Sequence, residues 1–456
     1  MSSIFKKKQL NVSSLKRNEI EKNLGAFDLI LMGIGAVIGT GVLVLTGLVA
    51  ATDAGPGVIF SFIIAAIVCG LVGLCYAEVS SGIPVSGSAY TYTYIAIGEF
   101  VAYLTGWILL AVYALTTATV ASGWSGYFVG FLEGLGFHLP EYLVTIPSAG
   151  GIINLPACGI VLFITFILSL GTKESKKINN MMVLVKLFII FLFVVVGFFY
   201  VKPSNWSPFL PFGIEGVLNG ASAVFFAFLG FDAISTSAEE VKNPQRNLPI
   251  GIISSLAVCT LIYIAVCLVM TGVLPYSELN VPDAMAHVLY FVNQNTIAGI
   301  ISIGAIVGIM AVILAYIYAA TRVFFAMSRD GLLPKSFSTV SRRTNAPTFS
   351  VWIIGTIIIL ITGFIDLKSL ANLSNIGALI AFILVSICTI ILRKKHPEIQ
   401  SGFKVPFMPI LPIIAILFCL FLLINLPIFT WLYFGIWLCI GTGVYFFYSR
   451  KHTILK

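Results

Sequence analysis

Long apolar stretches alternate with short polar segments along almost the whole chain. Twelve apolar runs can be counted, and most approach or exceed the roughly 20 residues with which a helix crosses a bilayer. They lie at about 26–51, 57–78, 98–130, 152–171, 179–201, 214–236, 249–273, 297–321, 348–365, 373–392, 407–426 and 428–449. This pattern predicts an all-α integral membrane protein with twelve transmembrane helices.

The first apolar run is interrupted near its centre by Gly33, Gly35, Gly39 and Gly41. In a helix each glycine costs about 1 kcal/mol relative to alanine, and irregular backbone inside a membrane is tolerated only where protein covers it or where it lines a cavity. An opened helix offers N–H groups to an anion and carbonyl groups to a cation. The stretch therefore indicates a site for a zwitterion such as an amino acid. In the alternative interpretation, these glycines only permit close helix packing.

The sixth run is interrupted in the same way, by Gly230 followed by the acid Asp232. We expect Asp232 to cap the restarted helix, in preference to a role in proton relay. Runs one and six each begin a group of five, and with five spans per group the second group starts in the opposite orientation. Interrupted segments at matching positions of two inverted halves indicate a transporter binding site at mid-membrane.

The fifth run contains an ionisable residue, Lys186. Such a residue inside a span is a functional candidate by default. However, Lys186 stands only about 8 Å into the run at 1.5 Å per residue, so its ammonium group could instead extend to the cytoplasmic interface. Position alone leaves both interpretations open.

The charges of the chain follow membrane topology. With the N-terminus in the cytoplasm and alternating spans, all 26 lysines and arginines fall on cytoplasmic segments except Lys186, Lys202 and Lys368. This is the positive-inside rule, so we expect a multi-pass protein of the plasma membrane with both termini cytoplasmic. The net charge of +8 therefore does not indicate a nucleic-acid partner. The first run is too long for a cleaved signal peptide.

Several functional classes are disfavoured by the residues. The eight cysteines lie in or beside apolar runs without a CxxC pair, and the histidines fall far apart in loops or the tail, so neither a metal site nor a catalytic set is expected. A nucleotide-binding loop is absent from the sequence, which disfavours ATP as the energy source. A repeated filter or ring of charges, typical of channels, is also absent. These histidines are His138, His287, His396 and His452.

Four stretches, taken in order, resemble the amino acid–polyamine–organocation (APC) superfamily, and specifically bacterial permeases related to cationic amino acid transporters. They are GIGAVIGTG (33–41), PVSGSAYTY (84–92), FFAFLGFDAISTSAEEVKNPQR (225–246) and SRDGLLP (328–334). The resemblance extends over about residues 20–450. It implies a LeuT-type 5+5 inverted repeat with two extra helices. The first repeat would occupy 26–201, the second 214–392 and the extra helices 405–449, between cytoplasmic tails at 1–25 and 450–456.

The same resemblance implies a substrate site at the two interruptions. The substrate carboxylate would meet N–H groups of the first, with the Thr40 hydroxyl as a further donor, and the α-ammonium group would meet carbonyl groups of both. Phe226 would cover the substrate as an aromatic gate. The implied substrate-binding residues are Val37, Ile38, Gly39, Thr40, Gly41, Phe226, Ala227, Leu229 and Phe231.

Lys186 matches a lysine that, in proton-coupled relatives, stands in for a sodium ion. The residues support this match independently, because a sodium site favours oxygen ligands and residues 304–320 contain no Ser, Thr, Asn or Asp. We therefore expect the proton as coupling ion, without sodium or any other cofactor. Protonated Lys186 would hold spans one and five together, and loss of the proton would let them part.

The expected substrate is a neutral amino acid, branched or small and apolar. Relatives that take lysine or arginine often carry an acid in span three, whereas Val112 stands at that position here, and residues 106–124 contain no acid. A cationic side chain buried there without a partner would be strongly disfavoured. We place Val112 and Thr116 in the side-chain pocket. An arginine or lysine transporter or exchanger, with Asp232 or Glu78 near the path, remains an alternative, as does a transporter-like sensor. A small membrane subunit or bound lipid is not excluded.

Overall fold

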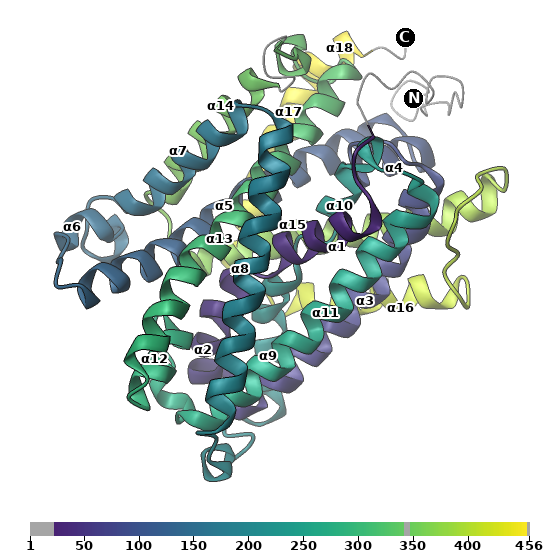
Figure 1. Ribbon diagram of the computed structural model, residues 1–456. Coiled ribbons are helices and arrows are strands. Elements are labelled where there is room, and N and C mark those ends of the chain that lie inside the picture. Colours follow the sequence, from purple (N-terminus) through teal and green to yellow (C-terminus); the bar gives the residue numbers. More distant parts are fainter. Residues whose placement is uncertain (1–21, 342–346, 454–456) are drawn as a thin grey trace.

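The computed structural model describes residues 22–341 and 347–453, with backbone alone for 172–177. Within these ranges every regular element is helical, and the single β-type pairing is an isolated bridge between Leu24 and Val241. Figure 1 shows the helices packed into an elongated bundle. The predicted N-terminal tail lies mostly outside the described residues, as do 454–456.

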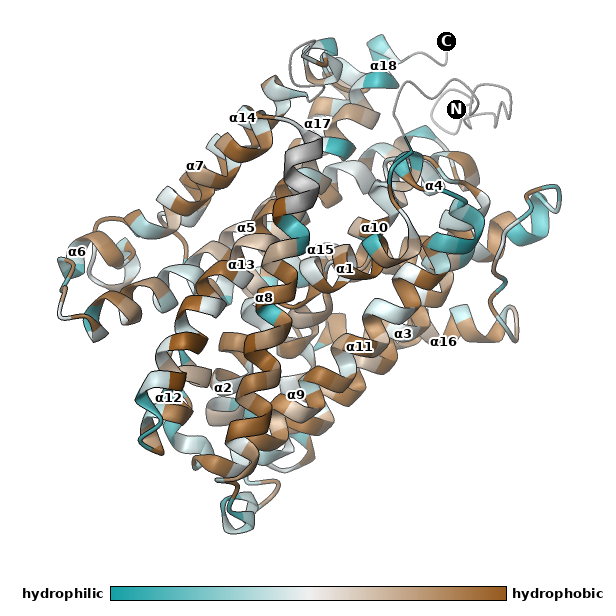
Figure 2. Cartoon of the chain, viewed as in Figure 1, coloured by the Kyte–Doolittle hydropathy of each residue, from teal (hydrophilic) through white to brown (hydrophobic). Residues whose placement is uncertain are grey.

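Each apolar run predicted from the sequence is helical. Long helices are α3 (Val58–Gly82), α5 (Glu99–Gly134), α8 (Thr172–Phe198), α11 (Pro244–Val273), α13 (Asn295–Arg329) and α15 (Leu367–Lys395). Shorter apolar helices are α1 (Ala26–Val37), α7 (Leu155–Ser169), α9 (Gly213–Val224), α14 (Thr348–Thr362), α16 (Ile410–Ile424) and α17 (Ile428–Val444). Within the described chain, eight helical stretches are long and apolar enough to cross a membrane. In Figure 2 the middle of these helices is mostly hydrophobic, and polar residues gather at helix ends and loops.

Short helices connect the long ones. They are α2 (Thr46–Val49), η3 (Ala50–Ala54), η4 (Gly55–Gly57), α4 (Ala89–Ala96), α6 (Glu141–Val144), η5 (Pro147–Ala149), η6 (Pro203–Trp206), η8 (Ala238–Glu240), η9 (Tyr276–Glu278), α12 (Ala284–Phe291), η10 (Lys335–Ser338), η11 (Tyr445–Ser449) and α18 (Arg450–His452). Chain segments before and after the two interruptions complete the list: η2 (Gly41–Leu45), η7 (Phe225–Phe228) and α10 (Ala233–Thr236).

The first interruption falls where the glycine stretch predicts it. Helix α1 ends at Val37, Ile38 is extended with φ −77° and ψ 106°, and the chain resumes at Gly41 as the π-helix η2. Gly33 and Gly35 lie inside α1, where a Cβ atom would clash with Ser255 of α11 and Val183 of α8 respectively. Close packing therefore explains the first two glycines, and the break itself involves the last two.

The second interruption follows η7. Leu229 is extended, with φ −61° and ψ 141°, and Gly230 has φ +121°, a value that disfavours any residue with a Cβ atom. A Cβ atom on Gly230 would also lie 2.8 Å from the carbonyl carbon and oxygen of Ala36. The two breaks are thus in direct contact in the interior of the bundle. Around them α11 packs along α3, and α5 packs along α13 and α15.

Candidate functional site

Lys186 of α8 is fully buried beside the first break. Its Nζ atom donates hydrogen bonds to the carbonyl oxygens of Gly35, at 2.9 Å, and Ile38, at 2.5 Å. Gly308 of α13 makes room for it, since a Cβ atom there would lie 2.8 Å from the Lys186 Cβ. The ammonium group therefore points into the protein and not to an interface, and it binds carbonyls that the break releases from helical hydrogen bonding.

Tyr263 of α11 links the two breaks. Its hydroxyl lies 3.0 Å from the carbonyl oxygen of Val37 and 2.7 Å from that of Ala227. Phe62 and Phe228, which also pack against each other, contact its ring with centroid distances of 5.3 and 5.0 Å. Sequence reasoning missed this residue, because a single tyrosine in an apolar run gives no sign of which distant carbonyls it will meet.

Most carbonyls predicted to bind the α-ammonium group already accept a hydrogen bond. Tyr263 contacts those of Val37 and Ala227, Lys186 contacts that of Ile38, and the Leu229 N–H donates to Phe226 at 3.2 Å. Because a carbonyl oxygen has two lone pairs, each can still accept a second donor. A cationic group entering here would share these oxygens with Lys186 and Tyr263.

The predicted carboxylate donors lie at the start of the restarted helix. The N–H of Leu43 donates to the carbonyl of Gly39 at 3.2 Å, so the N–H groups before it have no helical acceptor. Thr40 is fully buried, and its hydroxyl has no hydrogen-bond partner among the described residues. Its side chain packs against Gly123 of α5, and Gly39 packs against Val312 of α13. These donors therefore lie between α5 and α13.

The predicted capping role of Asp232 is wrong in its contacts. Asp232 stands at the N-cap position of α10, but its side chain makes no cap hydrogen bond. Its carboxylate instead accepts from the Tyr113 hydroxyl of α5 at 2.7 Å and from the Gly230 N–H at 3.3 Å. The N-cap residue has helical φ and ψ of −66° and −28°, whereas a capping side chain normally requires extended backbone. An acid thus lies next to α5, supplied by a different helix.

The aromatic residues of the second break have different surroundings. Phe226 is buried at the break, 4% exposed. Phe231 packs into an aromatic cluster with Tyr76 of α3 and Phe382 of α15, at centroid distances of 5.6 and 5.0 Å. The Phe231 ring is thus part of the packing between α3 and α15.

Val112 and Thr116 are both buried on α5. Val112 packs against Gly377 of α15 and lines an apolar pocket of about 310 Å³ bounded by α5, α13, α14, α15 and α17. The lining residues of this pocket include none of the break residues. Thr116 keeps a hydroxyl without a partner among the described residues. Thr116 therefore carries a polar group that a ligand could complete, whereas Val112 contributes only apolar surface.

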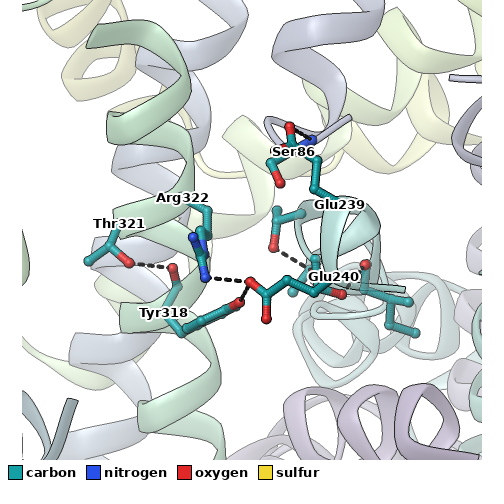
Figure 3. A network of polar contacts seen from close by, with 10 residues as sticks. Ser86, Glu239, Glu240, Tyr318, Thr321 and Arg322 are labelled. Carbon is teal, nitrogen blue, oxygen red and sulfur yellow. Dashed lines mark hydrogen bonds and ion pairs between the residues drawn. The ribbon is translucent and has the colours of Figure 1, made fainter. Parts of the chain in front are cut away.

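A polar network joins α13, the segment after α10 and the segment before α4 (Figure 3), and we call the part of the molecule formed by Ser86, Glu239, Glu240, Tyr318 and Arg322 the basic end. Arg322 of α13 forms an ion pair with Glu240, which also accepts from Tyr318 at 2.5 Å. Glu239 accepts from the Ser86 N–H at 2.9 Å and pairs with Arg329 at 3.4 Å. These glutamates follow α10, so the network ties the segment after the second break to α13. Sequence reasoning did not assign it.

Backbone pairing connects the start of α1 to the same network. The N–H groups of Asn23 and Leu24 donate to the Glu240 carbonyl at 2.9 and 3.1 Å, and the Lys242 N–H donates to the Leu24 carbonyl at 2.9 Å. The segments that precede the first break and follow the second are therefore joined at the basic end.

Comparisons with known proteins identify the class. The model of the amino acid permease family matches residues 24–445, so the chain belongs to this family, within the APC superfamily. It is 54% identical to a methylthioribose transporter of Bacillus subtilis, over the whole of both chains. It is 49% identical to the branched-chain amino acid permease BcaP of the same organism, over all of this chain and 99% of the relative. A vacuolar cationic amino acid transporter of Arabidopsis thaliana is 36% identical over 87% of this chain and 68% of its own length. The protein is therefore a multi-pass membrane transporter and not an enzyme.

Proposed function

We propose that this protein is a proton-coupled secondary transporter that imports neutral amino acids across the plasma membrane. The observation that carries the proposal is the buried Lys186 ammonium group on the carbonyls of Gly35 and Ile38. In this proposal the helices form twelve spans in a LeuT-type 5+5 inverted repeat, with both termini cytoplasmic. The breaks after α1 and η7 would be the matching interrupted segments of the two repeats.

Coupling follows from the two hydrogen bonds of Lys186. A protonated ammonium group carries the charge that a metal ion would otherwise supply between the carbonyls, and it holds α8 against the end of α1. Loss of the proton removes the charge and one donor, which weakens this link. Proton release would therefore favour separation of α1 from α8, and sodium would not be required.

The substrate would bind between the breaks. Its carboxylate would accept hydrogen bonds from the N–H groups of Gly39, Thr40 and Gly41 at the start of η2, where the helix dipole favours an anion. Its ammonium group would meet the free lone pairs of the Val37, Ala227 and Leu229 carbonyls. Phe226 would then cover it.

A neutral side chain is favoured over a cationic one. Val112, at the position where an acid would serve an arginine, faces Gly377 and an apolar pocket. Asp232 is an acid that contacts the middle of α5, through Tyr113, and its carboxylate is already shared by Tyr113 and Gly230. The alternative is an arginine transporter, and arginine uptake would contradict this argument. A sensor of the same fold would bind the substrate without accumulating it.

Methylthioribose is a second candidate substrate. The relative described as a methylthioribose transporter shares 54% of its residues with this chain over the full length of both, and methylthioribose, like leucine, carries no net charge. The name of that relative supports the candidate, and transport has to be measured for this chain.

The decisive experiment measures uptake of labelled leucine, arginine and methylthioribose into proteoliposomes, with and without an inward proton gradient. We expect proton-stimulated leucine uptake that is lost in Lys186→Ala and retained in Lys202→Ala, a matched change of an exposed lysine. Arginine uptake would contradict the neutral pocket. Sodium-stimulated uptake that survives Lys186→Ala would contradict the coupling role, and binding without accumulation would identify a sensor.

A further inference from the structure

Among the buried hydroxyl groups that lack a hydrogen-bond partner within the described residues, three belong to residues on α5, on α13 and at the first break. They are the Oγ1 atoms of Thr40 and Thr116 and the hydroxyl of Tyr316 on α13. The three residues are 0%, 1% and 1% exposed respectively. Buried polar groups in proteins are nearly always paired, and each unpaired one requires an explanation.

Neighbouring threonines on α5 show that the unpaired state of Thr116 is not general to this helix. Thr105, Thr117 and Thr119 return their hydroxyls to the carbonyls of Val101, Tyr113 and Leu115, at 2.7 to 2.8 Å. This internal bond is the usual solution for a threonine in an apolar helix. Thr116 lies on the same helix, with a backbone carbonyl one turn before it, but its hydroxyl does not bind this carbonyl.

The tyrosines around the breaks show the same contrast. The hydroxyl of Tyr113 binds Asp232, that of Tyr127 binds the Leu43 carbonyl at 2.9 Å, and that of Tyr263 binds both breaks. Tyr316, equally buried, has no such contact within the part of the chain that the structure describes, and neither has Tyr76, whose ring packs against Phe231. The Tyr316 hydroxyl therefore differs from those that serve to hold helices together.

The residues that carry these hydroxyls belong to α5 and α13, which pack along each other, or pack against α5. The Tyr316 ring is 5.8 Å from the ring of Tyr113, and Thr116 follows Tyr113 by one helical turn on α5. Thr40 packs against Gly123, two turns beyond Thr116 on the same face of α5. On α13, Val312 packs against Gly39 and stands one turn before Tyr316. Thr40, Thr116 and Tyr316 thus follow one another along α5 and α13 from the start of η2 toward Asp232.

From this arrangement we infer that, among neutral substrates, the site prefers one that bears a hydroxyl group on its side chain, which Thr116 and Tyr316 recognise. The inference rests on the proposed function, in which Thr40 serves the substrate carboxylate, so that the other two hydroxyls remain for the rest of the molecule. A site whose polar groups are completed by a substrate hydroxyl rejects the analogue that lacks it, because the protein groups are then left buried and unpaired. A purely apolar side chain of the same shape is therefore a poorer ligand.

L-threonine and L-valine form a matched pair for the test, since one methyl group of valine corresponds to the threonine hydroxyl. Binding of each is measured on the purified full-length protein by calorimetry. We expect wild type to prefer threonine by on the order of tenfold or more. In Thr116→Val and in Tyr316→Phe, which remove the hydroxyls at nearly constant shape, the preference falls toward one. Thr117→Val is the control, because that hydroxyl already binds the Tyr113 carbonyl, and it keeps the preference.

Equal binding of the two amino acids by wild type overturns the inference, as does a preference that survives both Thr116→Val and Tyr316→Phe. Should either variant bind neither amino acid, Thr116→Ser decides, because it keeps the oxygen on a smaller side chain and must keep the preference; its loss overturns the inference. Binding of neither amino acid by wild type contradicts the proposed amino acid substrate itself, and the inference fails with it.

Discussion

At the scale of single residues, two side chains occupy the carbonyls that the breaks release. Lys186 binds those of Gly35 and Ile38, and Tyr263 binds those of Val37 and Ala227. The lysine is the titratable link and joins α8 to α1. The tyrosine is a neutral donor and joins the first break to the second. The two links can therefore respond differently when a proton leaves, and only the lysine contacts weaken.

Tyr263→Phe tests the second link. The change removes one hydroxyl and leaves two buried carbonyls without that donor, a loss worth about 1–3 kcal/mol. We expect KM for the transported substrate to rise on the order of tenfold, since about 1.4 kcal/mol corresponds to a factor of ten. Proton stimulation should remain, because Lys186 is untouched. The comparison is Tyr290→Phe, a change at a tyrosine that is 40% exposed on α12, and an unchanged KM in Tyr263→Phe would refute the link.

The sequence identified Lys186, the titratable link, but not Tyr263, the neutral one. Lys186 was identifiable because a charged residue is rare within an apolar run. Tyr263 was not, because its partners lie 226 and 36 positions away in sequence, and only the fold brings them together. For the same reason the partner of Asp232 was unpredictable, since Tyr113 precedes it by 119 positions.

At the scale of elements, the helices were largely predictable, and the resemblance placed both breaks at one site, but the individual contacts between the breaks were not predictable. Apolar runs long enough to cross a membrane have few alternatives to a helix, because backbone groups in lipid must pair within the segment. Glycines also located both interruptions. Two features were not evident from the sequence: the start of α15 at Leu367, and the helix α4 between the second and third apolar runs. Both lie at the margin of the apolar pattern.

At Gly41 the two interrupted elements are in close contact. A Cβ atom at this position would clash with the backbone and side chain of Ala227 in η7. Gly41→Ala should therefore force the breaks apart, at a cost of about 1–3 kcal/mol for overpacking. We expect a lower thermal unfolding temperature in detergent and loss of uptake.

Gly70→Ala supplies the contrast to this substitution. Gly70 lies within α3, and a Cβ atom there meets nothing within 4 Å. Alanine favours the helix by up to about 1 kcal/mol, so this variant should be as stable as wild type or more so, with uptake retained. Equal stability of Gly41→Ala and Gly70→Ala would show that the close approach of η2 and η7 is dispensable.

At the scale of the whole molecule, the contacts at the basic end divide into two kinds. The start of α1 is joined to the segment after α10 by backbone hydrogen bonds across the Leu24–Val241 bridge. That joined unit is connected to α13 by side chains, chiefly the pair of Glu240 and Arg322. We expect the side-chain contacts to α13 to separate when a path to the breaks opens, and the backbone contacts to persist.

Cross-linking distinguishes these two kinds of contact. Leu24→Cys with Val241→Cys places thiols on paired backbone within one unit, whereas Glu240→Cys with Arg322→Cys places them across the boundary to α13. After treatment with a short thiol cross-linker, we expect uptake to persist for the first pair, to fall at least about tenfold for the second, and to return on reduction. Wild type with its own cysteines, seven of them buried, controls for reaction at native thiols, and each single-cysteine variant controls for loss of its original side chain.

Inhibition by the 24–241 cross-link would mean that α1 moves relative to the segment after α10. Full activity of the cross-linked 240–322 pair would mean that the basic end stays closed during transport. Either result would overturn this division, because the division requires the 24–241 contact to persist during transport and the 240–322 contact to separate.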